Sequence, residues 1–123
     1  MQFTEHPNHD FPTVESYAEG RIEIGGKSYA TPIVLASNGV FERPSEHFEQ
    51  LDDSRFAELL AEYGRPEVVL IGSGAKQRFL HPKTAAFLAA QGIGLEVMNT
   101  ASAARTLMIL HGEGRSVWAL LFP

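Results

Sequence analysis

One short apolar segment constrains the fold of this chain more than any other feature. Residues 67–71 have the sequence EVVLI, and Gly72-Ser73-Gly74 follow directly. A run rich in β-branched residues, without polar alternation, is typical of a parallel strand that is covered on both faces. The glycine turn then lies at the carboxyl end of that strand, which is where open α/β sheets bind ligands. The segment predicts a central strand with a candidate site at its end.

Helical patterns alternate with further strands around this segment. Apolar residues recur at helical spacing before Gly64, and the candidate N-caps of this helix are Asp52, Asp53 and Ser54. Pro82 suits the first position of a second helix behind a cap at His81, and Gly92 follows its end. A third helix is expected from about Thr100 to Leu110, with Asn99 or Thr100 as its cap. A buried strand is expected over 94–98 and a final strand over 115–122. This βαβα order predicts a partly parallel central sheet.

The first third of the chain has antiparallel character. Residues 21–24 and 27–30 alternate around Gly25-Gly26, which predicts a β-hairpin, and 32–36 form the next expected strand. Residues 1–19 are rich in turn formers and are expected to be an extended or partly mobile segment. We therefore predict a single three-layer α/β domain over residues 20–123, with an N-terminal antiparallel hairpin.

Composition excludes several classes of function. The chain has no cysteine, so disulfides, thiolate metal sites and thiol nucleophiles are excluded. Its net charge is −5 and its basic residues do not cluster strongly, which disfavours nucleic-acid binding. No apolar run approaches about 20 residues, so no membrane insertion is expected. The N-terminus does not resemble a signal peptide, and we expect a cytoplasmic protein.

The glycine loop fails the tests for three familiar motifs. A dinucleotide fingerprint needs a third glycine where Gln77 stands, and a P-loop needs a Gly-Lys-Ser/Thr sequence that is absent. A nucleophile elbow at Ser73 needs glycines where Ile71 and Ala75 stand. Two interpretations stay open. The backbone N–H groups hold an anion with help from Lys76, Gln77 and Arg78, or the glycines only permit a tight turn.

A carboxylate within an apolar strand marks a second candidate. Glu96 stands within Leu95–Met98, and a buried carboxylate needs a partner, for which Arg105 is the obvious candidate. Glu96, Thr100 and Arg105 form either a polar pocket beside the glycine loop or a structural ion pair between strand and helix. His6, His9 and Asp10 lie in the extended segment without a rigid frame, so we expect neither a metal site nor a cofactor.

Several short motifs recur in a characteristic order. They are Ile71-Gly72-Ser73-Gly74, Pro82, the stretch 92–100, Ala103-Ala104-Arg105-Thr106 and Glu113-Gly114-Arg115. Over residues 20–122 the series resembles the small uncharacterised family that includes mitochondrial respiratory complex I assembly factor 3 and an adipogenesis-associated protein. The resemblance implies a three-layer β+α/β/α fold, no established enzyme activity and, for the mitochondrial member, assembly through protein contacts. The family positions that carry over are Gly72, Gly74, Glu96, Thr100, Arg105 and Thr106.

The chain also departs from this family pattern. Asn99 stands where the family often has Asp, Ala104 where it often has Cys, and Leu107-Met108 where it often has Tyr-Asn. Chemistry that requires the cysteine is therefore excluded.

Three functional hypotheses follow from the residues and the resemblance. The first is a non-catalytic binding or assembly module with an unknown protein partner, as a monomer or small homo-oligomer. The second is an anion or nucleotide site at Gly72-Ser73-Gly74 with Lys76, Gln77 and Arg105. The third is an enzyme with an unrecognised site that uses Glu96.

Overall fold

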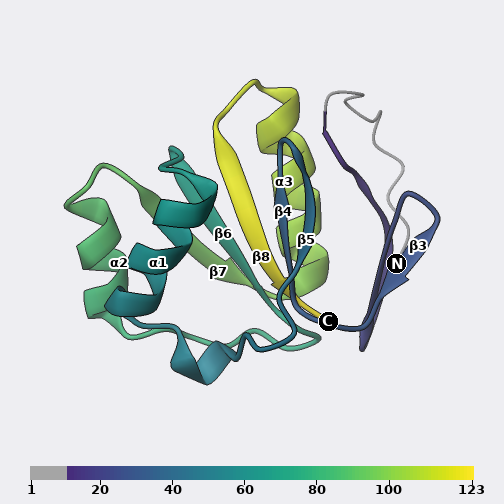
Figure 1. Ribbon diagram of the computed structural model, residues 1–123, viewed down its shortest axis with the longest axis horizontal. Coiled ribbons are helices and arrows are strands. Elements are labelled where there is room, and N and C mark those ends of the chain that lie inside the picture. Colours follow the sequence, from purple (N-terminus) through teal and green to yellow (C-terminus); the bar gives the residue numbers. More distant parts are fainter. Residues whose placement is uncertain (1–10) are drawn as a thin grey trace.

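A mixed five-stranded sheet forms the middle layer of the computed structural model, which describes residues 11–123 (Figure 1). Its strands are β4 (Ile33–Ala36), β5 (Gly39–Glu42), β6 (Val68–Ser73), β7 (Gly94–Met98) and β8 (Val117–Phe122). Their order is β5-β4-β8-β6-β7, with β6 parallel to both β7 and β8, and β4 antiparallel to β5 and β8. The predicted central strand is confirmed, because β6 has a parallel neighbour on each side and every residue in it is buried.

Two outer layers cover this sheet. Helices α1 (Asp53–Tyr63) and α2 (Pro82–Ala89) lie on one side, and α3 (Thr100–Gly112) lies on the other (Figure 1). A second antiparallel sheet of β1 (Val14–Ala18), β2 (Arg21–Ile24) and β3 (Lys27–Tyr29) packs beside α3. The three-layer β+α/β/α fold is confirmed. Strand β1 falls within the segment expected to be extended, and it pairs with the predicted hairpin.

The alternation of side chains along β6 divides the core in two. Val68 and Leu70 pack with α3 and the small sheet, while Val69 and Ile71 pack with α1 and α2. Within residues 11–123, no helix is long and apolar enough to cross a membrane.

The helices begin at the predicted caps. The Asp52 carboxylate accepts the N–H of Arg55 at 2.9 Å, and the Asn99 side chain accepts the N–H of Ser102 at 2.9 Å. The His81 ring accepts the N–H of Lys83 at 3.1 Å. Each cap accepts a backbone N–H that the first helical turn leaves unpaired. Residues close in sequence therefore determine where the three helices begin.

The expectation that residues 94–98 form a buried strand is wrong. Among the strands of residues 11–123, β7 lies at the edge of the sheet and pairs only with β6, and Glu96 is exposed. Leu95 and Val97 pack against the core on the α1 and α2 side, while Glu96 belongs to the opposite face of the strand. Solvent reaches the carboxylate there, so Glu96 does not need the buried partner that the sequence suggested.

A buried histidine closes the far end of α3. His111 is 4% exposed, and its ring stacks on Phe11 with centroids 3.9 Å apart. Its Nε2 lies 3.2 Å from the carbonyl oxygen of Val117. Burial lowers the pKa of His111, and the weaker effect of the Val117 carbonyl opposes the shift. The ring therefore stays neutral in the folded protein to a lower pH than in the unfolded chain.

This shift predicts a pH dependence of stability. The contribution of neutral His111 is fully present above about pH 6.5, the usual histidine pKa, and is lost as the pH falls through the lowered folded pKa. Between the lowered folded pKa and about pH 6.5, the unfolded chain binds more protons than the folded one. Urea unfolding at a series of pH values should show stability falling below about pH 6.5. His111→Gln should flatten this slope, and an unchanged slope in the variant would contradict the assignment.

Candidate functional site

A single threonine closes the loop at the end of β6. Its hydroxyl accepts the N–H of Gly74 at 2.8 Å and donates to the carbonyl of Phe122 at 2.6 Å. The N–H of Thr100 in turn donates to the carbonyl of Gly74 at 2.9 Å. Thr100 is fully buried. These bonds join the ends of β6 and β8 to the start of α3, which are distant in sequence.

The two glycines serve two different purposes in this closure. A Cβ on Gly72 would lie 2.8 Å from Thr100 Oγ1, 2.9 Å from Leu121 Cδ2 and 3.0 Å from Thr100 Cα. Gly74 instead has a φ of +95°, a conformation that residues with a Cβ rarely adopt. Gly72 thus permits close packing, while Gly74 permits the turn.

The Ser73 side chain organises the loop that follows. Its hydroxyl lies 2.8 Å from the carbonyl oxygen of Lys76 and 3.2 Å from that of Met98, and it accepts the N–H of Arg78 at 3.1 Å. Ser73 is buried. The hydroxyl is therefore used within the fold and does not face an open cleft.

Further contacts fasten the loop between β6 and α2 on both sides. The Gln77 amide donates to the carbonyl of Val97, on the edge strand, at 3.2 Å. The Arg78 guanidinium pairs with Glu49 at 2.7 Å and lies 4.3 Å from the centre of the Phe48 ring, both in the short helix η1 (Phe48–Gln50). Phe79 follows Gln77 and Arg78 and precedes α2, and it is 80% exposed.

These bonds bear on the anion site that the glycine loop suggested. The N–H groups of Gly74, Arg78 and Thr100 all donate within the chain, and Asn99 caps the start of α3. Loops that bind phosphate direct such donors at the ligand. An anion here would have to displace internal bonds.

The predicted site residues fall into two groups. The structure brings Gly72, Ser73, Gly74 and Thr100 together, with Lys76 and Gln77 in the adjoining loop. Glu96 and Arg105 are exposed, and neither takes part in the bonds that close the loop. Arg105 lies on α3, where its guanidinium is 3.4 Å from the Ser102 hydroxyl. Thr106, the last family position, contacts the Met98 sulfur at 3.4 Å.

Metal binding finds no support in the part of the chain that the structure describes. Residues 11–123 contain no group of three His, Asp or Glu side chains placed to hold an ion. His6, His9 and Asp10 lie outside the described residues.

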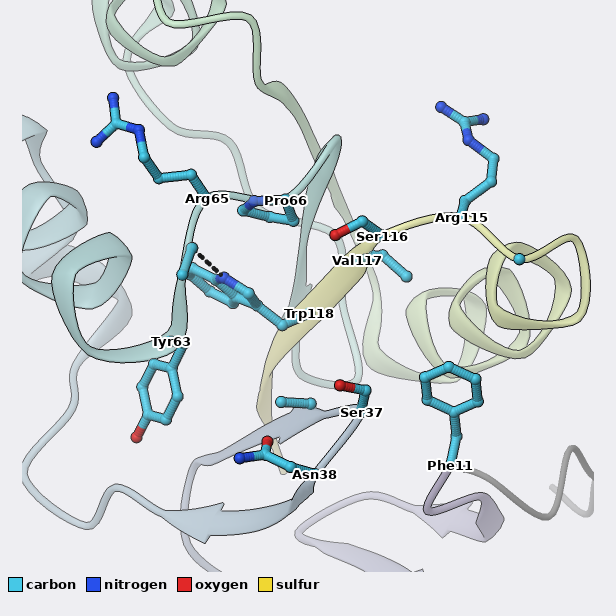
Figure 2. Close-up of a pocket in the computed structure, with 13 residues that line it drawn as sticks. Phe11, Ser37, Asn38, Tyr63, Arg65, Pro66, Arg115, Ser116, Val117 and Trp118 are labelled. Atoms are coloured by element: carbon cyan, nitrogen blue, oxygen red, sulfur yellow. Dashed lines mark hydrogen bonds between the residues drawn. The ribbon is translucent and has the colours of Figure 1, made fainter.

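Figure 2 shows a pocket of about 340 Å³ that is lined by residues near the start of β6 and β8. The glycine loop lies at the other end of β6. Trp118 forms part of the pocket wall and donates its indole N–H to the carbonyl of Gly64 at 2.9 Å. The side chains of Arg65 and Arg115 point away from it (Figure 2), and Arg115 pairs with Glu67 at 3.0 Å. The pocket thus has an aromatic wall and no arginine aimed into it. Its lining comes from segments that are far apart in the sequence, so no local motif in the sequence marked it.

A second feature that the sequence did not reveal is a cluster of ion pairs. Glu46 has a 4% exposed side chain and accepts two hydrogen bonds from Arg55, at 2.5 and 2.7 Å. Arg43 lies 3.7 Å from Glu46 and pairs with Glu62 at 2.9 Å. The bonds to Glu46 raise the pKa of Arg55. Each arginine thus has a carboxylate partner. Because Arg55 and Glu62 lie on α1 while Arg43 and Glu46 lie in the loop after β5, these ion pairs connect α1 to that loop.

Comparison with known proteins confirms the resemblance that the motifs suggested. A family model described as "Protein of unknown function (DUF498/DUF598)" matches residues 14–122. The mouse NADH dehydrogenase [ubiquinone] 1 alpha subcomplex assembly factor 3 is 29% identical over 110 residues, which are 89% of this chain and 60% of the mouse protein. An uncharacterised protein of Rhodobacter capsulatus is 32% identical over 89% of this chain and 83% of its own length. The chain thus spans less than two-thirds of the mouse assembly factor.

Solved structures show the same fold. A crystal structure from Bordetella parapertussis has a TM-score of 0.80 at 36% identity, covering 92% of this chain and 96% of its own. A solution structure from Xanthomonas campestris has a TM-score of 0.81 at 28% identity, covering 97% and 89%. With the family model matched over nearly the whole described chain, this protein belongs to the family described as "Protein of unknown function (DUF498/DUF598)".

Proposed function

We propose that this domain is a non-catalytic protein-binding module that assists the assembly of a protein complex. The observation that carries the proposal is the loop after β6, which is closed by internal hydrogen bonds and displays Phe79 to solvent. The names of several relatives, which are assembly factors, support the same role.

The exposure of Phe79 is unusual in this protein. Among the described residues, the large apolar side chains that are exposed are Phe79, at 80%, and Ile109, at 51%. Aromatic side chains are enriched in the cores of protein interfaces. The loop is already fastened through Gln77 and Arg78, so binding would order few new groups and the entropy cost would be low. The Phe79 ring is therefore suited to anchor a partner.

The alternatives receive less support from the same residues. An anion site at the glycine loop would compete with the bonds of Gly74 and Thr100. An enzyme that uses Glu96 would need the carboxylate positioned beside a bound substrate, whereas Glu96 is exposed on an edge strand.

Quantitative affinity capture from the native cell tests the proposal. The tagged full chain should recover a specific partner, and Phe79→Ser should lose it, since truncating an interface anchor weakens binding by about 30-fold. Ile109→Ser is the matched control, because it removes the other exposed apolar side chain, and it should retain the partner. The free energy of unfolding of each variant should lie within about 0.5 kcal/mol of that of the parent. Equal recovery by the parent and Phe79→Ser, or no specific partner, would contradict the proposal.

A further inference from the structure

Along the sequence, Phe79 lies among basic residues in a protein that is acidic overall. No Asp or Glu occurs between Glu67 and Glu96, although the chain has 15 acidic residues and a net charge of −5. The same stretch contains Lys76, Arg78 and Lys83. The acidic residues all lie elsewhere in the sequence, so the loop and the start of α2 form a basic segment that includes Phe79.

Two of the three cations remain available to a partner. Arg78 is neutralised by its ion pair with Glu49 at 2.7 Å. Lys76 and Lys83 are exposed, and neither forms an ion pair with any residue in the range 11–123. The two lysines therefore carry the positive charge that a partner would meet beside Phe79.

The backbone holds this charge pattern in place. The carbonyl of Lys76 and the N–H of Arg78 both bond to the Ser73 hydroxyl, at 2.8 and 3.1 Å. The N–H of Lys83 is bonded to the His81 cap at 3.1 Å. The main chain on each side of Phe79 is thus fixed by hydrogen bonds, which hold Lys76 and Lys83 at set positions along the backbone.

We infer that Lys76, Phe79 and Lys83 form one docking surface for a partner protein. An acidic segment of the partner contacts the two lysines, and an apolar pocket on the partner receives the Phe79 ring. The inference rests on the proposed function and specifies its partner. Complementary charge steers such an encounter and fixes its register. A nucleic acid would extend beyond the two lysines and meet the repulsion of the acidic remainder. An anionic bilayer would gain only two lysines and one ring, whereas stable membrane binding needs a larger apolar or polybasic surface.

Photo-cross-linking in the native host tests the surface directly. The full chain would carry p-benzoylphenylalanine at position 79 or, as the control, at position 109. The inference predicts that position 79 cross-links to one protein, at a segment with a net negative charge, and that position 109 does not. A cross-link to lipid or nucleic acid, or to a segment without negative charge, would overturn it. Absence of protein cross-links from both positions would overturn the proposed function as well.

Charge reversal then tests whether the partner segment is acidic, independently of whether the domain binds a protein. With the cross-linked partner purified, Lys76→Glu/Lys83→Glu should raise the Kd at least about tenfold at low salt, and the difference should shrink at high salt. Lys27→Glu, an exposed lysine on β3, should change the Kd less than about twofold. If Phe79→Ser abolishes binding but the double reversal leaves the Kd unchanged or lower, the acidic partner is wrong and the proposed function stands. Circular dichroism and thermal melts confirm that each variant is folded.

Discussion

Gly72→Ala should lower the free energy of unfolding by about 3 kcal/mol, because the new methyl group has no space. Its Cβ would lie 2.8 Å from Thr100 Oγ1 and 2.9 Å from Leu121 Cδ2. The leucine can rotate, but Thr100 Cα, at 3.0 Å, belongs to the backbone at the start of α3. Relief therefore requires the helix to move away from β6, which would stretch the bonds between Thr100 and Gly74.

Urea denaturation of the parent and the variant measures this cost. Gly94→Ala on the adjacent strand is the matched control, because its Cβ would have its nearest contacts at 3.6 and 3.8 Å. The control should change stability by less than about 1 kcal/mol. Equal stability of Gly72→Ala and Gly94→Ala would contradict the close packing of β6 against α3.

Thr100→Val should destabilise the protein by about 2–4 kcal/mol, because the buried N–H of Gly74 and the partly buried carbonyl of Phe122 lose their hydrogen bonds to the hydroxyl. Valine has nearly the same shape, but it can neither accept the N–H of Gly74 nor donate to the carbonyl of Phe122. Thr100 is fully buried, so water cannot readily replace the hydroxyl. The loss falls at the point where β6, β8 and α3 meet.

The control for this substitution is Thr106→Val on the same helix. The Thr106 hydroxyl has only a weak contact with the Met98 sulfur at 3.4 Å, so the change should cost less than about 1 kcal/mol. Chemical denaturation of both variants, with an unchanged m-value, provides the comparison. A cost below about 1 kcal/mol for Thr100→Val would show that the threonine does not hold the loop closed.

Local sequence predicted the elements well where short-range chemistry decides them. The apolar run before Gly72 identified the central strand, and Asp52, His81 and Asn99 marked the starts of the three helices. The Gly25-Gly26 turn, with φ of +59° and +80°, was predicted for the same reason. In each case, the hydrogen bond or backbone angle that determines the element is formed by residues close together in the sequence.

The sequence could not show which strand lies at the edge of the sheet. Residues 94–98 have an apolar pattern like that of β6, but strand order depends on contacts between distant segments. The expectation that Glu96 is buried was wrong for that reason. The closure by Thr100, the pocket beside Trp118 and the cluster around Glu46 also combine distant segments, so none has a local signal.

The structure also explains two departures from the family pattern. Ala104, where the family often has Cys, is fully buried in the core under α3. A small apolar side chain satisfies that position by packing alone. Asn99, where the family often has Asp, caps α3 through the N–H of Ser102, a role that either side chain performs. Both positions therefore contribute to the fold.

The Gly74 amide provides the most direct test of the central claim, that the loop is closed internally and displays Phe79 rather than binding an anion. Its hydrogen exchange and chemical shift can be followed by NMR in the full chain, with and without added inorganic phosphate or ATP. Because the N–H donates to buried Thr100, it should exchange as slowly as the amides of β6, and its shift should not respond to either anion. Fast exchange together with a saturable shift on addition of phosphate or ATP would contradict the account and restore the anion site.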